Sequence, residues 1–395
     1  MERERGSPLA AIACGGTGGH LFPGVAVARA LKERGVEAQL LVSSKAVDEI
    51  GTGWVPGVEV VRLPVLPFSG RGVGRSVWAL CKSVRVCAGL FRRRRPCAVL
   101  AMGGFASAPA VVCARLMGIP VFLHEANAVP GRANRWFSRF AREVFVYFPE
   151  AGRRLKNRRV CVSGMPVRGE FERLDRDRCC QALGLDAQLP VLLVMGGSQG
   201  ARPLNGLMEK TVGMLAAEAP ELQYVHLTGA HDADLMRRAY EKHGVRAVVE
   251  AFFREMWIVL GAATLAVTRA GASSLAEQAA VRLPAILIPF PYAADDHQYH
   301  NARAFEQSGA ACVLRQSDAT PETVAKLVLD LLRDRRRLEM MRQALGKWHV
   351  KYAAERIADA LAGLAGRVGE GSSVIGSRAP CDSEAAVLGA NGRSC

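Results

Sequence analysis

A glycine-rich segment at residues 15–20 (GGTGGH) places four glycines around Thr17 and ends on His20. Glycine lets the backbone approach an anionic ligand closely, and the N-terminus of a following helix favours negative charge. Of these residues, His20 is best suited to accept a proton near neutral pH. The spacing is neither GxGxxG nor that of a Walker A loop, which argues against NAD and ATP as ligands. A tight turn with a structural histidine is the alternative interpretation.

Apolar runs that end in glycine or polar residues recur twice more in the first half of the chain. One is followed by Gly103-Gly104 and the other by His124-Glu125-Ala126-Asn127. Polar groups at the ends of successive strands of one parallel sheet lie close together, because the carboxyl ends of the strands share one edge. We therefore expect ligand-binding loops there, with these candidate residues: Gly15, Gly16, Gly103, Gly104, Glu125 and Asn134.

The second half repeats this pattern. GGSQGA at 196–201 follows an apolar run and again departs from GxGxxG. RAGASSLAE at 269–277 follows another run, and Ser273 or Ser274 is expected to cap the helix that begins there. Free N–H groups at such a helix start can hold a diphosphate, and Glu277 could accept hydrogen bonds from vicinal ribose hydroxyls. The alternative for Glu277 is a capping-box carboxylate at the third or fourth helical position.

Metal chemistry finds little support in the sequence. The pair Asp295-Asp296 precedes His297 and Gln298 where a loop leads into a helix, and acidic residues favour that place because of the helix dipole. No third ligand is apparent beside this pair. The 11 cysteines form no CxxC pair and no zinc-type spacing with histidine, so we interpret them as reduced core residues of a cytosolic protein. We predict neither a metal nor a cofactor.

Short, continuous apolar runs alternate with helical stretches along most of the chain. This alternation predicts an α/β fold with parallel sheets whose strands are buried on both faces. The pattern starts afresh at Pro190 after a polar stretch. We expect a first domain of residues 1–163 completed by a C-terminal helix at about 340–365, a second domain of 164–339, and a disordered tail at 366–395. Two such sheets facing each other predict a ligand in the interdomain cleft.

The net charge of +15 is confined to one end of the chain. Residues 1–170 contain 26 Lys+Arg against 11 Asp+Glu, and the remainder contains 26 of each. This asymmetry indicates an anionic partner for the first half. No nucleic-acid motif appears, so we exclude nucleic acid. The segment 71–95 combines Trp78 with several cations and suits an anionic membrane surface, although its apolar residues could instead form an ordinary core helix.

Taken in order, the motifs resemble those of the MurG family, the undecaprenyldiphospho-muramoylpentapeptide β-N-acetylglucosaminyltransferases of peptidoglycan synthesis. They are GGTGGHLFPGVAVA, GGFASAP, HEANAVPGRANR, GMPVR, GGSQGARPLN, RAGASSLAE and DDHQYHNA, and the resemblance covers about residues 9–345. It implies the GT-B architecture of two Rossmann-like domains, with UDP-GlcNAc held mainly by the second and lipid I by the first. The family makes lipid II, on which cell shape and cell division depend.

The resemblance also assigns residues to the substrates. It implies contacts with UDP-GlcNAc at Thr17, Gly18, Gly19, Asn127, Arg168, Ser198, Phe253, Ala272, Ser273, Ser274, Leu275, Ala276, Glu277 and Gln298. The Phe253 contact would be made by its backbone to the uracil. The four glycines named above, together with Glu125 and Asn134, are assigned to the acceptor or the diphosphate. The sequence departs from the family pattern at Phe105, Ala126 and Met165, where Tyr, Gln and Asn are usual, so hydrogen bonds expected there are in doubt.

The expected reaction is a single inverting displacement in which His20 assists removal of the proton from the C4 hydroxyl of lipid I. The expected location is the cytoplasmic face of the cell membrane, as a peripheral protein, with other cell-wall synthesis proteins as further partners. Two related enzymes remain alternatives: a diacylglycerol glycosyltransferase and a UDP-GlcNAc 2-epimerase. The non-enzymatic alternative is a nucleotide-binding membrane adaptor.

Overall fold

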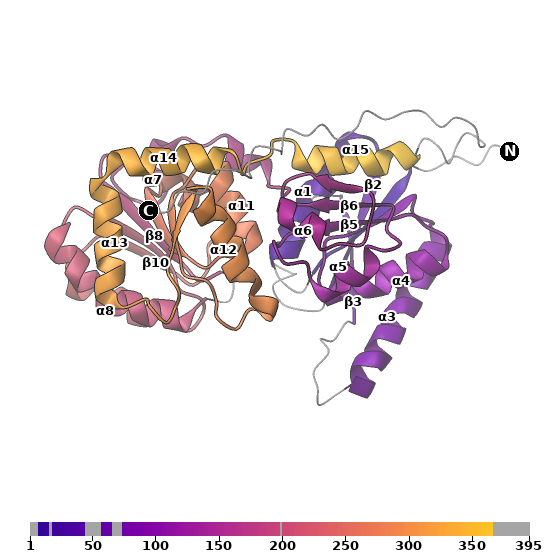
Figure 1. Cartoon of the computed structure of the whole chain (residues 1–395), viewed down its shortest axis with the longest axis horizontal. Helices are drawn as coiled ribbons and strands as arrows, with labels where there is room; N and C mark the ends of the chain where they lie inside the picture. Colours follow the sequence, from indigo (N-terminus) through magenta and orange to yellow (C-terminus); the bar gives the residue numbers. More distant parts are fainter. Residues whose placement is uncertain (1–6, 16–17, 44–56, 65–72, 198–199, 366–395) are drawn as a thin grey trace. The chain divides into compact units, whose positions relative to one another are not determined.

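The computed structural model describes residues 7–15, 18–43, 57–64, 73–197 and 200–365. The described residues divide into two compact units (Figure 1). One contains the residues up to Arg168 and those from Val350 onward, and the other contains Gly169–His349. The expected tail at 366–395 lies outside the described residues, as do Gly16, Thr17 and Ser198.

The first unit is built on a parallel sheet with the strand order β3-β2-β1-β4-β5-β6-β7. The apolar runs of the sequence predicted every one of these strands. Burial on both faces explains why most of these runs are continuous rather than alternating, whereas the edge strand β3 exposes Glu59 and Arg62. The strands are β1 (Leu9–Ala13), β2 (Glu37–Ser43), β3 (Glu59–Leu63), β4 (Ala98–Ala101), β5 (Val121–Glu125), β6 (Glu143–Val146) and β7 (Val160–Val162).

Parallel strands need crossover connections, and the described connections of this sheet contain helices. The helices of the first unit are α1 (Gly18–Glu33), α3 (Val73–Arg93), α4 (Ala108–Leu116), α5 (Arg132–Phe137), α6 (Pro149–Arg153) and α15 (Ala353–Ala365), with a 3₁₀ turn η1 (Phe105–Ser107). Helix α1 begins at Gly18 and contains Pro23. Pro23 is the sixth helical residue, where it removes one hydrogen bond within the helix. The start at Gly18 places His20 in the first turn of α1.

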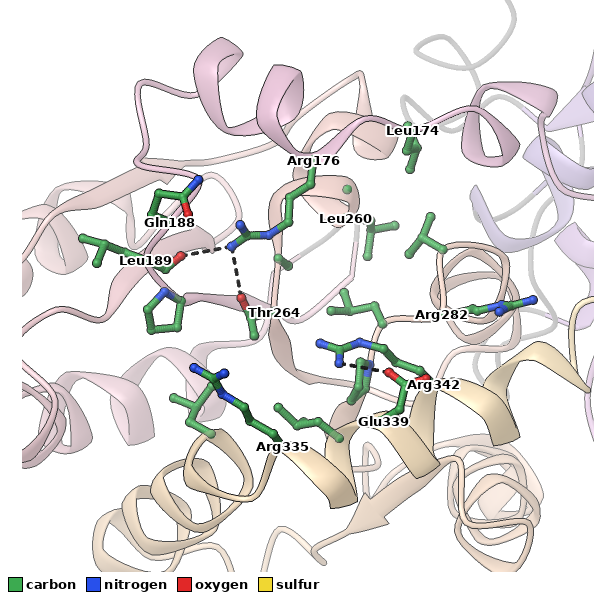
Figure 2. A pocket seen from close by; sticks show the side chains of 18 of the residues that line it. Leu174, Arg176, Gln188, Leu189, Leu260, Thr264, Arg282, Arg335, Glu339 and Arg342 are labelled. Carbon is green, nitrogen blue, oxygen red and sulfur yellow. Dashed lines mark hydrogen bonds and ion pairs between the residues drawn. The ribbon is translucent and has the colours of Figure 1, made fainter.

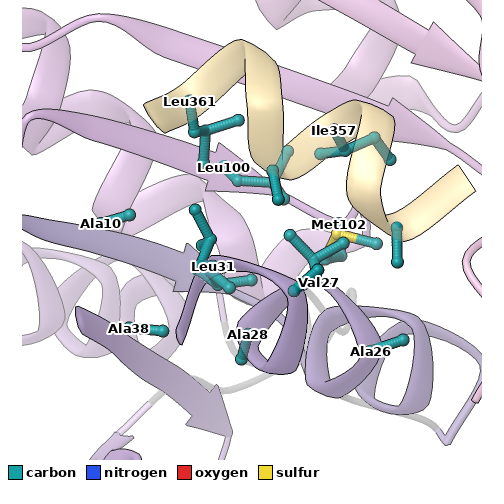
Figure 3. Close-up of a cluster of buried hydrophobic side chains, with 14 of the residues drawn as sticks. Ala10, Ala26, Val27, Ala28, Leu31, Ala38, Leu100, Met102, Ile357 and Leu361 are labelled. Carbon is teal, nitrogen blue, oxygen red and sulfur yellow. The ribbon is translucent and has the colours of Figure 1, made fainter. Parts of the chain in front are cut away.

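The C-terminal helix α15 completes the core of the first unit (Figure 3). Ile357 and Leu361 of α15 are fully buried in a cluster with Val27 and Leu31 of α1. Outside this apolar contact, Arg34 Nε lies 2.6 Å from Asp359 Oδ1. The start of the first sheet therefore depends on residues more than 300 positions further along the chain.

The second unit has a parallel sheet in the order β10-β9-β8-β11-β12-β13. Each of its strands was predicted from an apolar run: β8 (Val191–Met195), β9 (Gln223–Leu227), β10 (Ala247–Glu250), β11 (Leu265–Thr268), β12 (Ala285–Leu287) and β13 (Ala311–Val313). The helices are α7 (Arg176–Ala182), α8 (Arg202–Glu218), α9 (Ala233–Lys242), α10 (Met256–Ala262), α11 (Ala272–Ala280), α12 (His297–Gln307), α13 (Pro321–Arg333) and α14 (Arg335–Gly346), with 3₁₀ turns η2 (Gly169–Glu172) and η3 (Ala294–Asp296).

The long helical region expected at the C-terminal end is two helices that belong to different cores. Leu338 and Met341 of α14 are buried in the core of the second unit, whereas α15 packs in the first. The chain returns to the first unit from Val350, not from about residue 340. The sequence suggested one helix because both segments are helical in pattern, and periodicity alone does not say which core each apolar face enters.

In both sheets the strand order reverses direction in the middle. Connections leave to one side of β1 and β8 and continue on the other side from β4 and β11. Ligands of open α/β sheets bind outside the carboxyl ends of the strands at such switch points. The glycine segments after β1, β4, β8 and β11 therefore occupy the positions in each unit that suit a ligand.

Candidate active site

His20 lies where the loops after β1 and β4 meet. Gly103 and Gly104 have φ angles of 100° and 75°, which favour glycine. A Cβ added at Gly103 would lie 3.2 Å from Cε1 of the His20 ring, and one added at Gly104 would lie 3.4 Å from its Nε2. A side chain at Gly103 would crowd the imidazole, and Gly104 packs against the same ring, which ties two of the predicted motifs to one side chain.

Glu125 at the end of β5 organises the loop that carries Asn127. The Glu125 carboxylate accepts hydrogen bonds from the Asn127 N–H at 2.9 Å, the Gly131 N–H at 3.0 Å and Asn134 Nδ2 at 2.9 Å. Burial raises the pKa of Glu125, and these hydrogen bonds oppose that shift. Glu125 and Asn134 are both 2% exposed. They form the frame of the loop, whereas Asn127 is half-buried and more accessible to a ligand.

His124, beside Glu125, is enclosed in the first unit. Its Nε2 lies 3.2 Å from the Gly164 carbonyl oxygen. Burial lowers its pKa to about 4, and the neighbouring His20 adds to the lowering. His124 is therefore neutral at pH 7, which leaves His20 as the histidine of this region that a substrate could approach.

Arg168 belongs to the first unit, although its position in the sequence suggested the second domain. Its guanidinium lies 4.7 Å from the centroid of the Phe22 ring on α1, and the residue is 2% exposed. Contact with an aromatic face is favourable for a buried cation. This contact places a cation beside the first turns of α1.

In the second unit, the loop at 196–201 joins β8 to α8. Gly197 and Gly200 have φ angles of 94° and 73°, and Gly200 packs directly on the end of β9. A Cβ at Gly200 would lie 2.3 Å from the Thr228 carbonyl oxygen, closer than any real contact. The glycine spacing of this loop thus reflects a close approach of two backbone segments.

Helix α11 begins without the serine cap that we expected. Its N-cap is Gly271, whose extended backbone (φ −69°, ψ 134°) makes no side-chain cap hydrogen bond. Ser273 and Ser274 are the second and third helical residues, so their N–H groups lie in the first turn, where a helix supplies no acceptor. These amides can therefore serve an anion.

The other predicted residues of α11 are all buried. Leu275 and Ala276 are buried, Ala272 is 6% exposed, and the Leu275 N–H already donates to the Gly271 carbonyl at 3.0 Å. Glu277 is the sixth helical residue, which rules out the capping-box alternative at the third or fourth position. It is 9% exposed. The role of Glu277 must therefore be sought in a ligand or in its core neighbours.

The amide of Gln298 has a defined orientation. Its Oε1 accepts hydrogen bonds from the Ala270 N–H at 3.2 Å and the Phe290 N–H at 3.0 Å. Two backbone donors require the oxygen at that place, so Nε2 faces away from them and can only donate. Asn301, fully buried, supports the same turn through Nδ2 to the Ala270 carbonyl at 3.2 Å. Gln298 thus suits a ligand oxygen.

Arg269 is a residue of this region to which the sequence assigned no role. Its Nη1 donates to the carbonyls of Ile288 and Pro289 at 3.0 and 3.2 Å, and its Nη2 donates to Gln316 Oε1 at 2.6 Å. Burial lowers its pKa. The only sign of this role in the sequence was that a cation directly follows the apolar run that forms β11. Arg269 fixes the end of β12, from which the segment with Gln298 departs.

The remaining predicted features are placed separately. Phe253 follows β10 and is half-buried. Asp295 and Asp296 have φ angles of 52° and 51°. Among the described residues, no group of three or more His, Cys, Asp or Glu side chains could hold a metal ion. Nor does any described helix combine the length and apolar character that a bilayer crossing requires.

A cavity of the second unit lies at the opposite edge of the sheet from the glycine loop and the start of α11. It has a volume of about 1080 Å³, and its lining includes Pro190, Thr264 and Pro284, each immediately before a strand. The glycine loop and the start of α11 follow the opposite ends of the same strands. At about 3.3 Å per residue, a five-residue strand separates these edges by roughly 15 Å.

Two arginines of this cavity, Arg176 and Arg342, are engaged with the protein itself (Figure 2). Arg176 Nη2 donates to the Leu189 carbonyl at 3.0 Å and to Thr264 Oγ1 at 3.3 Å, and Arg342 pairs with Glu339 at 3.6 Å. Helices α10, α11 and α13 end at this edge, and cations near helix C-termini offset the helix dipole. Cations are therefore expected at this edge without an anionic ligand.

Comparison with known proteins identifies the family. Residues 10–146 match the glycosyltransferase family 28 N-terminal domain, and residues 191–358 match its C-terminal domain. A UDP-N-acetylglucosamine–N-acetylmuramyl-(pentapeptide) pyrophosphoryl-undecaprenol N-acetylglucosamine transferase of Synechococcus elongatus is 38% identical over 90% of this chain and 98% of its own. The enzyme of the same name from Syntrophotalea carbinolica is 40% identical over 88% and 96%.

Solved structures agree with this assignment. The crystal structure of Acinetobacter baumannii MurG has a TM-score of 0.70 and 26% identity over 90% of this chain and 99% of that chain. A UDP-GlcNAc 2-epimerase from Neisseria meningitidis, at 12% identity, has a TM-score of 0.66 over 90% and 99%, and shares the fold alone. The expected GT-B class of two Rossmann-like α/β domains is confirmed. The chain belongs to glycosyltransferase family 28 and, within it, to the MurG family of N-acetylglucosamine transferases.

Proposed function

We propose that this protein transfers N-acetylglucosamine from UDP-GlcNAc to the C4 hydroxyl of MurNAc-pentapeptide-diphospho-undecaprenol, converting lipid I into lipid II. The observation that carries the proposal is the match, over about nine-tenths of the chain, to relatives with this named activity. The polar groups at the carboxyl ends of both sheets support it, because they suit a sugar diphosphate and a hydroxyl that must lose a proton.

The reaction is a single displacement at the anomeric carbon. The acceptor O4 forms a bond to C1 of GlcNAc while the bond from C1 to the diphosphate oxygen breaks, and its electron pair leaves with UDP. The hydroxyl proton passes to His20, directly or through water, because His20 lies at the meeting point of the loops after β1 and β4. Attack from the face opposite UDP inverts C1 and gives the β-1,4 linkage.

The departing diphosphate gains negative charge during this step. We assign its stabilisation to N–H groups in the first turn of α11 at Ser273 and Ser274, and to the loop at 196–201. Glu277 binds the ribose hydroxyls, and Gln298 donates from Nε2 to a sugar oxygen. The preorganised helix start and buried frame reduce the reorganisation needed as charge develops.

Turnover with defined acceptors tests the function. With radiolabelled UDP-GlcNAc and a short-chain lipid I analogue, we expect labelled disaccharide lipid and equimolar UDP. Replacing the acceptor with diacylglycerol should abolish transfer, and omitting the acceptor should leave UDP-GlcNAc unchanged. Transfer to diacylglycerol, epimerisation without acceptor, or binding without any UDP release would each replace the proposal by one of the alternatives.

We further propose that α3 and the neighbouring end of α4 bind an anionic membrane surface on the cytoplasmic side. Helix α3 lies beside α4 (Figure 1). Its residues Ala79, Ser83, Cys87 and Phe91, spaced by four, form a buried stripe. Phe91 therefore belongs to the core and not to the membrane surface. For this stripe, the interpretation of 71–95 as a core helix holds.

The opposite face of α3 keeps the properties expected of a membrane surface. Trp78 is 63% exposed, with Lys82 Nζ 5.2 Å from its ring centroid, and Arg85 is also exposed. Leu116, the last residue of α4, is 78% exposed. Of the four arginines at 92–95, only the first two remain available, because Arg94 pairs with Glu37 and Arg95 donates to the Met117 carbonyl.

Vesicle binding tests this surface. Each cation near an anionic bilayer contributes about 1 kcal/mol, so the double variant K82S/R85S should bind phosphatidylglycerol vesicles about 30-fold more weakly. Co-sedimentation measures the partition, and Arg238→Ser, an exposed position on α9, is the control. Equal binding by both variants, or equal binding to uncharged phosphatidylcholine vesicles, would contradict the assignment.

A further inference from the structure

A chain of buried polar side chains ends at the Thr228 carbonyl, against which Gly200 packs. It joins three residues that are far apart in the sequence: Asn205 in the first turn of α8, His226 on β9 and Tyr240 on α9. All three are at most 1% exposed. Buried polar networks are favourable only when every member is satisfied, so their hydrogen-bond directions are informative.

The directions in this chain follow from Asn205. Its Nδ2 donates to the Thr228 carbonyl at 2.9 Å and to Asp232 Oδ2 at 2.8 Å, which uses both amide hydrogens. Its Oδ1, 3.1 Å from His226 Nε2, must therefore accept. His226 donates from Nε2 and accepts at Nδ1 from the Tyr240 hydroxyl at 3.0 Å.

This arrangement requires a neutral imidazole, since a charged ring would present two donors. Burial lowers the pKa of His226 to about 3, so the ring is neutral at pH 7. The Asn205 oxygen, which can only accept here, selects the tautomer that carries its hydrogen on Nε2, and the Tyr240 hydroxyl satisfies the remaining acceptor Nδ1. Removing that hydroxyl leaves Nδ1 buried without its donor and weakens the support of the Asn205 amide, which holds the Thr228 carbonyl.

The Thr228 carbonyl is the group on which the glycine loop rests. A Cβ at Gly200 would lie 2.3 Å from that oxygen and 2.8 Å from Gly229 Cα. The loop therefore fits against β9 only while the carbonyl is held where Asn205 places it. Asp232 extends the contact to the start of α8, where Arg202 Nε lies 3.9 Å from its Oδ1.

We propose that Asn205, His226 and Tyr240 are positioning residues that hold Gly200 and the start of α8 in place for the donor diphosphate. None of them touches the substrate. The proposal rests on the proposed function, because the loop is assigned there to the diphosphate of UDP-GlcNAc. It adds that donor affinity depends on the Tyr240 hydroxyl, which reaches Asn205 only through His226.

Tyr240→Phe is the discriminating variant, since it removes only that hydroxyl. Its control is Tyr224→Phe. The ring centroids of Tyr224 and Tyr240 are 4.9 Å apart, and Tyr224 is fully buried in the same core but is not part of the relay, the hydrogen-bonded chain of Asn205, His226 and Tyr240. With one buried hydrogen bond lost, we expect Tyr240→Phe to raise the Kd for UDP about 3–10-fold. The kcat at saturating donor and the KM for the lipid I analogue should stay within twofold. Tyr224→Phe should leave all of these values within twofold.

Backbone hydrogen exchange without ligand separates this proposal from the proposed function. Amides at 200–204 should exchange faster in Tyr240→Phe than in Tyr224→Phe, at a temperature where both are folded. Equal exchange, or equal Kd values despite UDP binding, would overturn the positioning role and leave the function standing. If the wild-type protein binds no UDP, the function and its donor assignment fail, whereas faster exchange would still show that the relay holds the loop.

Discussion

His20→Ala is expected to lower turnover by about 10²–10⁴-fold, the usual cost of removing a general base. The KM for UDP-GlcNAc should change by less than about threefold, because a base acts on the acceptor hydroxyl and binds neither uridine nor diphosphate. The imidazole projects from the first turn of α1 and packs against Gly103 and Gly104. Single-turnover experiments with the lipid I analogue measure the chemical step directly.

Two further variants make this result specific. His20→Gln keeps hydrogen bonding but cannot accept a proton near neutral pH, so its loss should approach that of His20→Ala. His231→Ala, an exposed histidine after β9, should retain full activity. Retained turnover in both His20 variants would remove His20 from the reaction. A loss confined to the KM for UDP-GlcNAc would make it a donor-binding residue instead.

The architecture was accessible from sequence because buried parallel strands leave a simple pattern. Each run of apolar residues could only be satisfied by a sheet covered on both faces, and the turn glycines marked where the strands end. The same logic placed His20 and Glu277 beside strand ends. Helix limits were harder to predict, since Gly18 and Pro23 both disfavour helix and tertiary packing decides the start of α1.

What remained hidden depends on contacts between distant residues. The roles of Glu125 and Asn134 as a loop frame follow from hydrogen bonds that no motif specifies. Arg168 looked like part of the second domain because the boundary was placed by composition, whereas its contact with Phe22 places it in the first unit. The relay from Tyr240 to Asn205 joins residues on three elements, so sequence spacing carries no trace of it.

Glu277→Ala is expected to weaken UDP binding by about 10–100-fold, because a charged acceptor contributes about 1.5–3 kcal/mol per hydrogen bond. Glu277 is an acidic residue within α11, whose first turn we assign to the diphosphate, and it is neither a cap nor an exposed surface charge. A ribose beside that diphosphate would present its two hydroxyls to such a carboxylate. Calorimetric titration with UDP measures the loss, and Glu241→Ala on α9 is the control.

A modified ligand locates the interaction on the sugar. The wild-type protein should bind 2′-deoxy-UDP about 10-fold more weakly than UDP, because one charge-assisted hydrogen bond is missing. In Glu277→Ala the two ligands should bind equally, since the partner of the 2′ hydroxyl has been removed. If the deoxy ligand is disfavoured to the same degree in both proteins, Glu277 does not contact the ribose. Its effect would then be structural, and Glu277→Gln, which preserves the side chain's shape, should restore UDP affinity nearly completely.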